Sequence, residues 1–172
     1  SRIDKAVLDF LPNLKFIATR STGYDHIDLS SSNDNGIKVS FVPGYGDNTV
    51  AEYTFGLILN LTRKIYKAIS QIKQKESFSL RDLRGVDLKG KTIGVIGVGG
   101  IGKEVIKIAK GFGMNIIAFS PHQDIELSKN LGFNYTSLEE LLGLSDIITI
   151  HCPYNKSTHH LINKENINLV KK

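Results

Sequence analysis

The sequence predicts an α/β protein with a doubly wound parallel sheet, preceded by part of a second domain. Two observations predict the sheet: from Thr92 onward, strand-length apolar segments alternate with segments of helical periodicity, and the strand segments are apolar almost throughout. A third observation, two short apolar segments before residue 47 with turn residues after each, predicts the separate partial domain.

The first part of the chain has a strand–loop–strand pattern. Lys15–Thr19 is an apolar run that stops at the turn-prone Ser21–Gly23, so a buried strand and a loop are expected there. Ser30–Gly36 is typical of a helix end, and Ile37–Val42 is a second strand closed by a Pro–Gly turn. These elements lack partners for a complete sheet.

One long helix is expected to follow. Apolar residues recur at three- and four-residue steps from Asn48 to about Gln74, at Val50, Tyr53, Leu57, Leu61 and Ile65. We place the domain boundary near the start of this helix, which divides the chain into residues 1–46 and 47–172.

The alternating part is expected to contain four strands and four helices. Ser137 and Glu140 form a capping-box pattern at the start of one helix. The expected strands are 92–96, 115–119, 133–135 and 146–150, and the expected helices are 101–112, 125–131, 137–142 and 163–170.

Composition and charge exclude several classes of protein. A hydrophobic content of 41% argues against a disordered chain. The net charge is only +5 and the Lys and Arg residues do not form long blocks, so nucleic-acid binding is not expected. Cys152 is the single cysteine, which allows no intrachain disulfide and fits the reducing cytoplasm. No apolar run has the ~20 residues needed to cross a bilayer. The chain begins with Ser1, carries no secretory leader, and is interpreted as cut at both ends.

The strongest motif is a G-x-G-x-x-G made by Gly97, Gly99 and Gly102. It follows a predicted strand and opens a predicted helix, which is the context that makes it informative. Gly97 would allow the tight turn, Gly99 the approach of a pyrophosphate, and Gly102 close helix–strand packing. The amides of Gly100 and Ile101 would face the phosphates, so the motif predicts a Rossmann-type dinucleotide-binding domain.

The cofactor choice depends on the residue that ends the second strand. About 18–20 residues past such a motif, NAD-binding proteins place an Asp or Glu on the ribose hydroxyls. Here that position is Ser120, followed by Pro121 and His122. Serine can bond a ribose hydroxyl but carries no charge to repel a 2′-phosphate. NAD is therefore favoured, and NADP stays open.

Nearly the whole chain resembles the D-isomer-specific 2-hydroxyacid dehydrogenases. The matching segments occur in family order: 14–19, 23–29, 36–39, Val42-Pro43, Val50-Ala51-Glu52, 90–94 with the glycine motif, and His151-Cys152-Pro153 followed by Thr158 and 161–163. Residues 63–68, 78–80 and 111–114 are similar to the D-lactate dehydrogenase branch.

The resemblance implies that residues 1–46 belong to a split, flavodoxin-like substrate domain. Thr22 and Gly23 would bind the substrate carboxylate, with Thr22 also near the cofactor. The remaining cofactor-binding residues it implies are Val50, Cys152, Pro153 and Thr158. It also implies a homodimer that acts on a small 2-keto or 2-hydroxy acid. The single cysteine and the lack of a long apolar run predict a cytoplasmic protein with no membrane partner.

The catalytic Arg, Glu and His of this family lie beyond the point that matches Lys172. No catalytic residue maps onto this chain, which is expected to be inactive alone. Gly100 also departs from the basic residue common at its position, and Ser120 from the ribose acid. Two alternatives remain: a non-catalytic dinucleotide-sensing protein of the same fold, and a related formate or phosphite dehydrogenase.

The histidines are given structural roles. His151 ends an apolar strand and is expected to bond to backbone there. His159 and His160 have no cysteine or carboxylate at a ligand spacing, so no metal site is expected.

Overall fold

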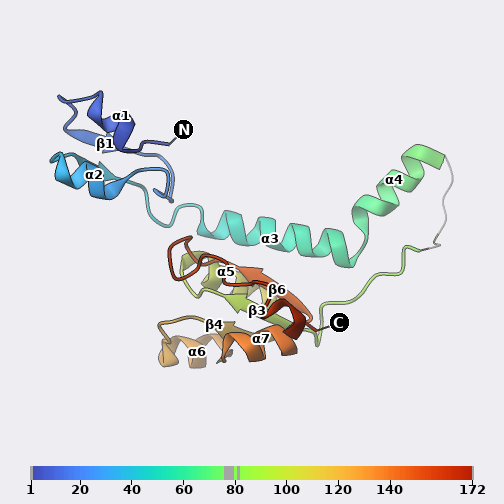
Figure 1. The fold of residues 1–172 in the computed structure, drawn as a ribbon. Coiled ribbons are helices and arrows are strands. Elements are labelled where there is room, and N and C mark those ends of the chain that lie inside the picture. Colours follow the sequence, from blue (N-terminus) through green and yellow to red (C-terminus); the bar gives the residue numbers. More distant parts are fainter. Residues whose placement is uncertain (1, 76–79, 81, 172) are drawn as a thin grey trace. The chain divides into compact units, whose positions relative to one another are not determined.

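A computed structural model describes residues 2–75, 80 and 82–171. Its contacts divide the chain into two compact units, Ser1–Gly46 and Asp47–Lys172, which are described in turn (Figure 1).

The first unit contains two helices and a two-stranded parallel sheet. Strand β1 (Phe16–Ala18) pairs with β2 (Lys38–Ser40), with Ile17 opposite Val39. Helix α2 (Leu29–Asp34) is capped at its N-terminus by Asp28, whose carboxylate accepts hydrogen bonds from the amide and hydroxyl of Ser31. These bonds hold the pKa of Asp28 below its usual value.

Helix α1 (Lys5–Asp9) was not predicted from the sequence. Asp4 caps it by accepting from the Val7 amide at 3.2 Å. The helix is a single short turn, and Leu8 is its one buried residue. An element of this length carries too little periodicity to be recognised in the sequence.

The second unit is built on a four-stranded parallel sheet, which confirms the predicted fold class. Its strands are β3 (Thr92–Ile96), β4 (Asn115–Phe119), β5 (Asn134–Tyr135) and β6 (Ile147–Ile150). The strand order is β5-β4-β3-β6, so the chain moves outward from the central β3 in one direction and returns to its other side. This reversal creates the crevice in which such sheets bind ligands.

Helices cover both faces of this sheet. On one face α3 (Asp47–Thr62) packs against α5 (Gly100–Gly111), and Ala51, Phe55, Val105 and Ala109 are buried there with the strand residue Val95. The aromatic rings of Phe55 and Phe112 stack with their centroids 5.3 Å apart. Helix α6 (Ile125–Leu131) adds partly buried leucines to the same core.

The other face carries α7 (Leu138–Leu144). Leu138, Leu141 and Leu142 form a second core with Ile96. The predicted capping box is present in part, because the Ser137 hydroxyl accepts from the Glu140 amide while the Glu140 carboxylate bonds to the Thr136 hydroxyl. These bonds lower the pKa of Glu140.

The single long helix expected from Asn48 to Gln74 was wrong. Helix α3 ends at Thr62, and a separate α4 (Ile65–Lys75) begins after a turn in which Lys64 has a φ of 53°. The side-chain oxygen of Asn60 accepts from the Tyr66 amide at 2.8 Å and so caps the new helix. Periodicity continued across the break because apolar residues occur on both sides of it.

The last predicted helix was also wrong in extent. Of residues 163–170 only Ile167–Leu169 forms a helical turn, of the 3-10 type (η1). Asn163 and Asn166 interrupt the helix by bonding to nearby backbone: Asn163 accepts from the Glu165 amide, and Asn166 accepts from the Asn163 amide. Among the described residues, no helix is both long and apolar enough to cross a membrane.

Candidate functional site

Three strand ends meet at the glycine motif. The Gly97 amide donates to the Phe119 carbonyl at 2.8 Å, and the His151 amide donates to the Ile96 carbonyl at 2.7 Å. These bonds join the carboxyl ends of β4 and β6 to the end of β3. The motif therefore starts at the edge where parallel α/β sheets bind their ligands.

Gly97 makes the turn out of β3. Its φ is 92°, a conformation that side chains disfavour. A β-carbon there would lie 2.8 Å from the backbone of His151 and Cys152. Glycine is thus required at this position for two reasons: the backbone conformation of the turn and the close approach of the neighbouring strand end.

The other two glycines have opposite surroundings. A β-carbon at Gly102 would collide with the Gly97 carbonyl oxygen, so this glycine lets α5 lie close against the turn. Gly99 has no atom within 4 Å of its β-carbon position and faces open space. Gly99 is also the N-cap residue of α5 and supplies no capping side chain.

The start of α5 presents unused hydrogen-bond donors. Among the described residues, the amides of Gly99, Gly100 and Ile101 have no acceptor. Free amides at a helix N-terminus, beside a glycine that leaves room for close approach, fit the pyrophosphate of a dinucleotide. The residues present therefore fit an NAD-type cofactor.

Asp47 is part of this neighbourhood and was missed in the sequence. Its carboxylate lies against Gly100, in the space that a side chain at position 100 would occupy. No local sequence pattern links the two residues, because they are brought together only by the packing of α3 on α5. Their position in the fold was the missing information.

The end of β4 carries no free acid. Ser120 is half-buried and His122 is exposed. The first carboxylate after them, Asp124, accepts from the Leu127 amide at 2.9 Å as the cap of α6. Ser120 is thus the first polar side chain after the end of β4.

The loop after β6 is folded by its own side chains. Cys152 is half-buried and contacts the core beside α7. The Thr158 hydroxyl donates to the Pro153 carbonyl at 2.6 Å and accepts from the Asn155 amide at 2.8 Å. Thr158 therefore fixes the shape of the loop that begins where β6 meets Gly97.

The side-chain role expected for His151 was wrong. Its ring atom Nε2 is buried without a hydrogen-bond partner among the described residues, although the backbone amide is bonded to β3. Burial lowers the pKa of His151, because a charged ring would lose its hydration. Burial therefore favours the neutral form of the ring.

Thr22 and Gly23 belong to the first unit, in the loop that follows β1. The Ser21 hydroxyl donates to the Gly23 carbonyl at 2.6 Å and holds the loop in a tight turn. Within the described part of the chain, the Thr22 and Gly23 amides have no acceptor. Both are available to an anion. Val50 lies in the first turn of α3 and is 41% exposed.

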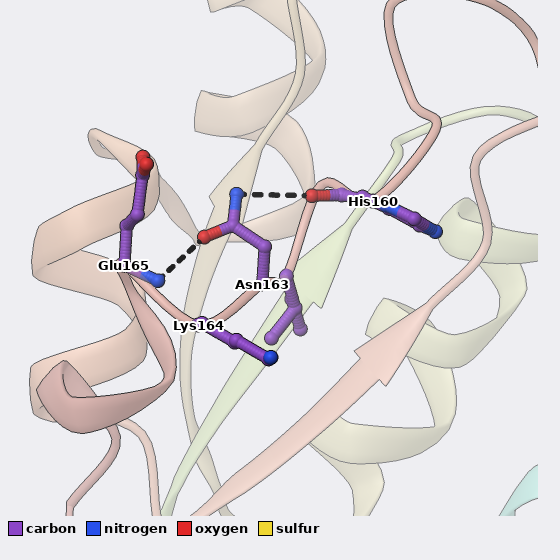
Figure 2. Close-up of a pocket in the computed structure, with 5 residues that line it drawn as sticks. His160, Asn163, Lys164 and Glu165 are labelled. Atoms are coloured by element: carbon purple, nitrogen blue, oxygen red, sulfur yellow. Dashed lines mark hydrogen bonds between the residues drawn. The ribbon is translucent and has the colours of Figure 1, made fainter.

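A separate hollow of about 540 Å³ lies beside the returning segment after β6 (Figure 2). The Asn163 side chain in this turn is already paired: it donates to the His160 carbonyl and accepts from the Glu165 amide. None of its lining residues belongs to the glycine motif. In the described residues, no group of three or more His, Cys, Asp or Glu side chains could hold a metal ion.

Comparison with known proteins identifies the family. Residues 55–172 match the family model for the D-isomer specific 2-hydroxyacid dehydrogenase, NAD binding domain. The chain belongs to the D-isomer-specific 2-hydroxyacid dehydrogenase family. The resemblance predicted from the motifs is thereby confirmed.

Relatives of the chain in this dehydrogenase family align with nearly all of it. A 2-hydroxyacid dehydrogenase homolog of Zymomonas mobilis is 44% identical over 96% of this chain and 51% of its own length. A glyoxylate reductase of Aeropyrum pernix is 40% identical over 99% of the chain and 53% of its own length. The chain thus spans about half the length of the curated relatives it matches.

Solved structures of the family agree in fold. The crystal structure of D-lactate dehydrogenase from Aquifex aeolicus, complexed with NAD and lactic acid, superposes with a TM-score of 0.91 at 39% identity. The superposition includes 99% of this chain and 51% of the Aquifex aeolicus chain.

Proposed function

We propose that the protein is an NAD-dependent oxidoreductase that interconverts a small 2-keto acid and the corresponding D-2-hydroxy acid. The observation that carries the proposal is the glycine motif at the meeting point of three strand ends, with free amides at the start of α5. Membership in the 2-hydroxyacid dehydrogenase family supports the reaction type.

Two backbone sites of the chain would divide the binding work. The amides of Gly99, Gly100 and Ile101 bind the pyrophosphate, and Gly97 and Gly102 keep that loop close to the sheet. The amides of Thr22 and Gly23 bind the substrate carboxylate. The bound nicotinamide supplies or accepts the hydride.

The other cofactor contacts would come from side chains around the same sheet edge. Ser120 bonds the adenosine ribose, and the loop of Cys152, Pro153 and Thr158 covers the adenosine side. Val50, exposed on the first turn of α3, lies beside the nicotinamide. Because Ser120 is uncharged, the site accepts NADP as a second cofactor with lower preference.

Pyruvate is the favoured keto acid, and glyoxylate is the second candidate. A named D-lactate dehydrogenase and a named glyoxylate reductase are similar to this chain at 39% and 40% identity. The two acids differ by one methyl group, and a methyl-sized difference in a pocket changes selectivity by about 1–3 kcal/mol. Substrate choice therefore lies in a few side chains around the reacting carbon.

The test is turnover by the protein at its natural full length. NADH oxidation is followed with pyruvate and with glyoxylate, and the chirality of the product is determined. D-lactate formation with a higher kcat/KM for pyruvate is expected. Dinucleotide binding without turnover of any 2-keto acid would contradict the proposed reaction and leave a dinucleotide-sensing protein or a formate or phosphite dehydrogenase.

The assembly we propose is a cytoplasmic homodimer. Its free, half-buried Cys152 suits a reducing compartment. The second unit has exposed apolar residues on α3, among them Leu57 and Leu61, which a partner subunit would cover.

A further inference from the structure

The start of α3 places a carboxylate at the start of α5. Asp47 is the first residue of α3, and its Cγ lies 2.6 Å from the position that a β-carbon of Gly100 would take. Gly100 is the first residue of α5 and stands at one of the three positions of the G-x-G-x-x-G motif that do not require glycine. The carboxylate thus occupies the side-chain space of a residue that has no side chain.

Helix packing holds Asp47 in this place. One turn further along α3, Ala51 is completely buried, and Phe55 follows it in the same core as Val105 and Ala109 of α5. The first turn of α3 is therefore fixed beside the first turn of α5. Asp47 itself is half-buried.

In the part of the chain that the structure describes, the Asp47 carboxylate is not paired with a cation. Among the described residues, none forms a salt bridge or a side-chain hydrogen bond with Asp47. Gly100 contributes no charge. The positive end of α5, which would attract a pyrophosphate, is thus already facing one negative charge.

We propose that Asp47 sets the affinity for the dinucleotide by repelling its pyrophosphate. The inference rests on the proposed function, because it concerns the same cofactor site. A pyrophosphate bound to the Gly99–Ile101 amides lies within a few ångströms of the carboxylate, and two like charges at that range disfavour each other. Asp47 therefore weakens binding and promotes release of the cofactor.

A purely structural role makes a different prediction. An acid in the first turn of α3 also stabilises that helix through its dipole. If this were its only role, neutralising Asp47 would lower the melting temperature and leave the cofactor affinity unchanged. Affinity and its dependence on salt therefore separate the two roles.

The experiment compares Asp47→Asn with wild type in the full-length protein by NADH fluorescence titration. The Kd for NADH is expected to fall about tenfold at low ionic strength, and this gain shrinks as salt screens the charges. Glu139→Gln is the matched control: Glu139 is an exposed acid in the first turn of α7, and removing its charge leaves the Kd unchanged.

Gly100→Ala tests the contact itself. The added β-carbon displaces the Asp47 carboxylate without adding a charge. Asp47→Asn should then change the Kd less in the Gly100→Ala background than in wild type, which a double-mutant cycle measures. Equal effects in both backgrounds would show that the contact with Gly100 is not the cause.

The outcomes separate this inference from the proposed function. If wild type binds NADH and Asp47→Asn binds it equally or more weakly, Asp47 does not repel the cofactor and the inference is overturned alone. If wild type binds no dinucleotide, the proposed function fails and the inference fails with it.

Discussion

Gly102 is the residue whose size most directly controls the glycine motif. In Gly102→Ala the new β-carbon meets the Gly97 carbonyl oxygen, a backbone atom that cannot rotate away. We expect a loss of about 1–3 kcal/mol in the free energy of unfolding and weaker NADH binding. Urea denaturation and fluorescence titration measure the two effects.

Gly111→Ala is the matched control for that substitution. Gly111 also lies in α5, but nothing is within 4 Å of its β-carbon position. Alanine is the better helix former, so this variant should be more stable by up to about 1 kcal/mol. A Gly102→Ala protein as stable as Gly111→Ala would contradict the close approach seen at the turn.

Ser120 is expected to control the choice between NADH and NADPH. In Ser120→Asp a carboxylate reaches the ribose position, where it bonds the 2′-hydroxyl of NAD and repels the 2′-phosphate of NADP. The ratio of kcat/KM for NADH over NADPH should rise about tenfold or more. Gln123→Asp adds the same charge beyond the strand end and should leave the ratio unchanged.

At this scale the sequence predicted residue types better than contacts. The three motif glycines could be assigned because their spacing follows a strand and opens a helix. The Asp47–Gly100 contact could not, since it depends on how two helices distant in sequence pack. The Nε2 atom of His151, which has no partner among the described residues, depends likewise on burial that the sequence does not encode locally.

At the scale of elements, Asp146 joins three segments of the chain: it lies just before β6 and bonds to Thr92 at the start of β3 and to Lys171. Its carboxylate accepts from the Thr92 amide at 2.9 Å and from the Lys171 ammonium at 2.7 Å. The bond from Lys171 is the larger cause, and that from Thr92 the next, of a pKa below the usual value for Asp146.

Asp146→Asn should therefore destabilise the protein in a pH-dependent manner. A carboxyl whose folded pKa is depressed contributes stability above its unfolded pKa, about 3.9, and loses it as pH falls through the folded value. We expect a cost of about 1 kcal/mol near pH 7 that disappears in acid. Thermal unfolding between pH 7 and pH 3 measures it.

Asp87→Asn is the control for this pH profile. Asp87 pairs with Arg63, but its side chain is 85% exposed, and exposed ion pairs contribute little. Its substitution should leave stability nearly unchanged at every pH. An Asp146→Asn variant with the same flat profile would show that the three segments are not joined through this carboxylate.

Strands and capped helices were predicted more accurately than helix breaks. The bounds of β3, β4 and α6 agree with the expected ranges, because apolar runs and turn residues mark their ends. The break between α3 and α4 has no glycine or proline to mark it. It depends on Lys64 adopting a positive φ and on Asn60 capping from the preceding helix.

For the whole molecule, the proposed homodimer makes α3 an interface. Tyr53, Leu57 and Leu61 recur at four-residue steps along one side of α3 and are exposed, Leu61 at 77%. In Leu61→Glu a charge would be buried between subunits, so the Kd for dissociation of the dimer should rise at least about tenfold. Sedimentation velocity of the full-length protein measures its mass.

Leu144→Glu places the same substitution on a different helix. Leu144 ends α7 and is 58% exposed, so it provides the same exposed leucine away from α3. This variant should sediment like wild type. A Leu61→Glu protein that stays dimeric would place the subunit contact elsewhere.

The junction of β3, β4 and β6 is held by main-chain hydrogen bonds, from the Gly97 amide to the Phe119 carbonyl and from the His151 amide to the Ile96 carbonyl. Every amino acid except proline offers the same donor, and every one offers the same acceptor. Apart from Gly97, where glycine is required, the side chains at these strand ends can therefore change while the ligand-binding turn keeps its shape. Substitutions at positions such as Ser120 and Gly100 can therefore change cofactor preference and affinity without breaking the hydrogen bonds of this junction.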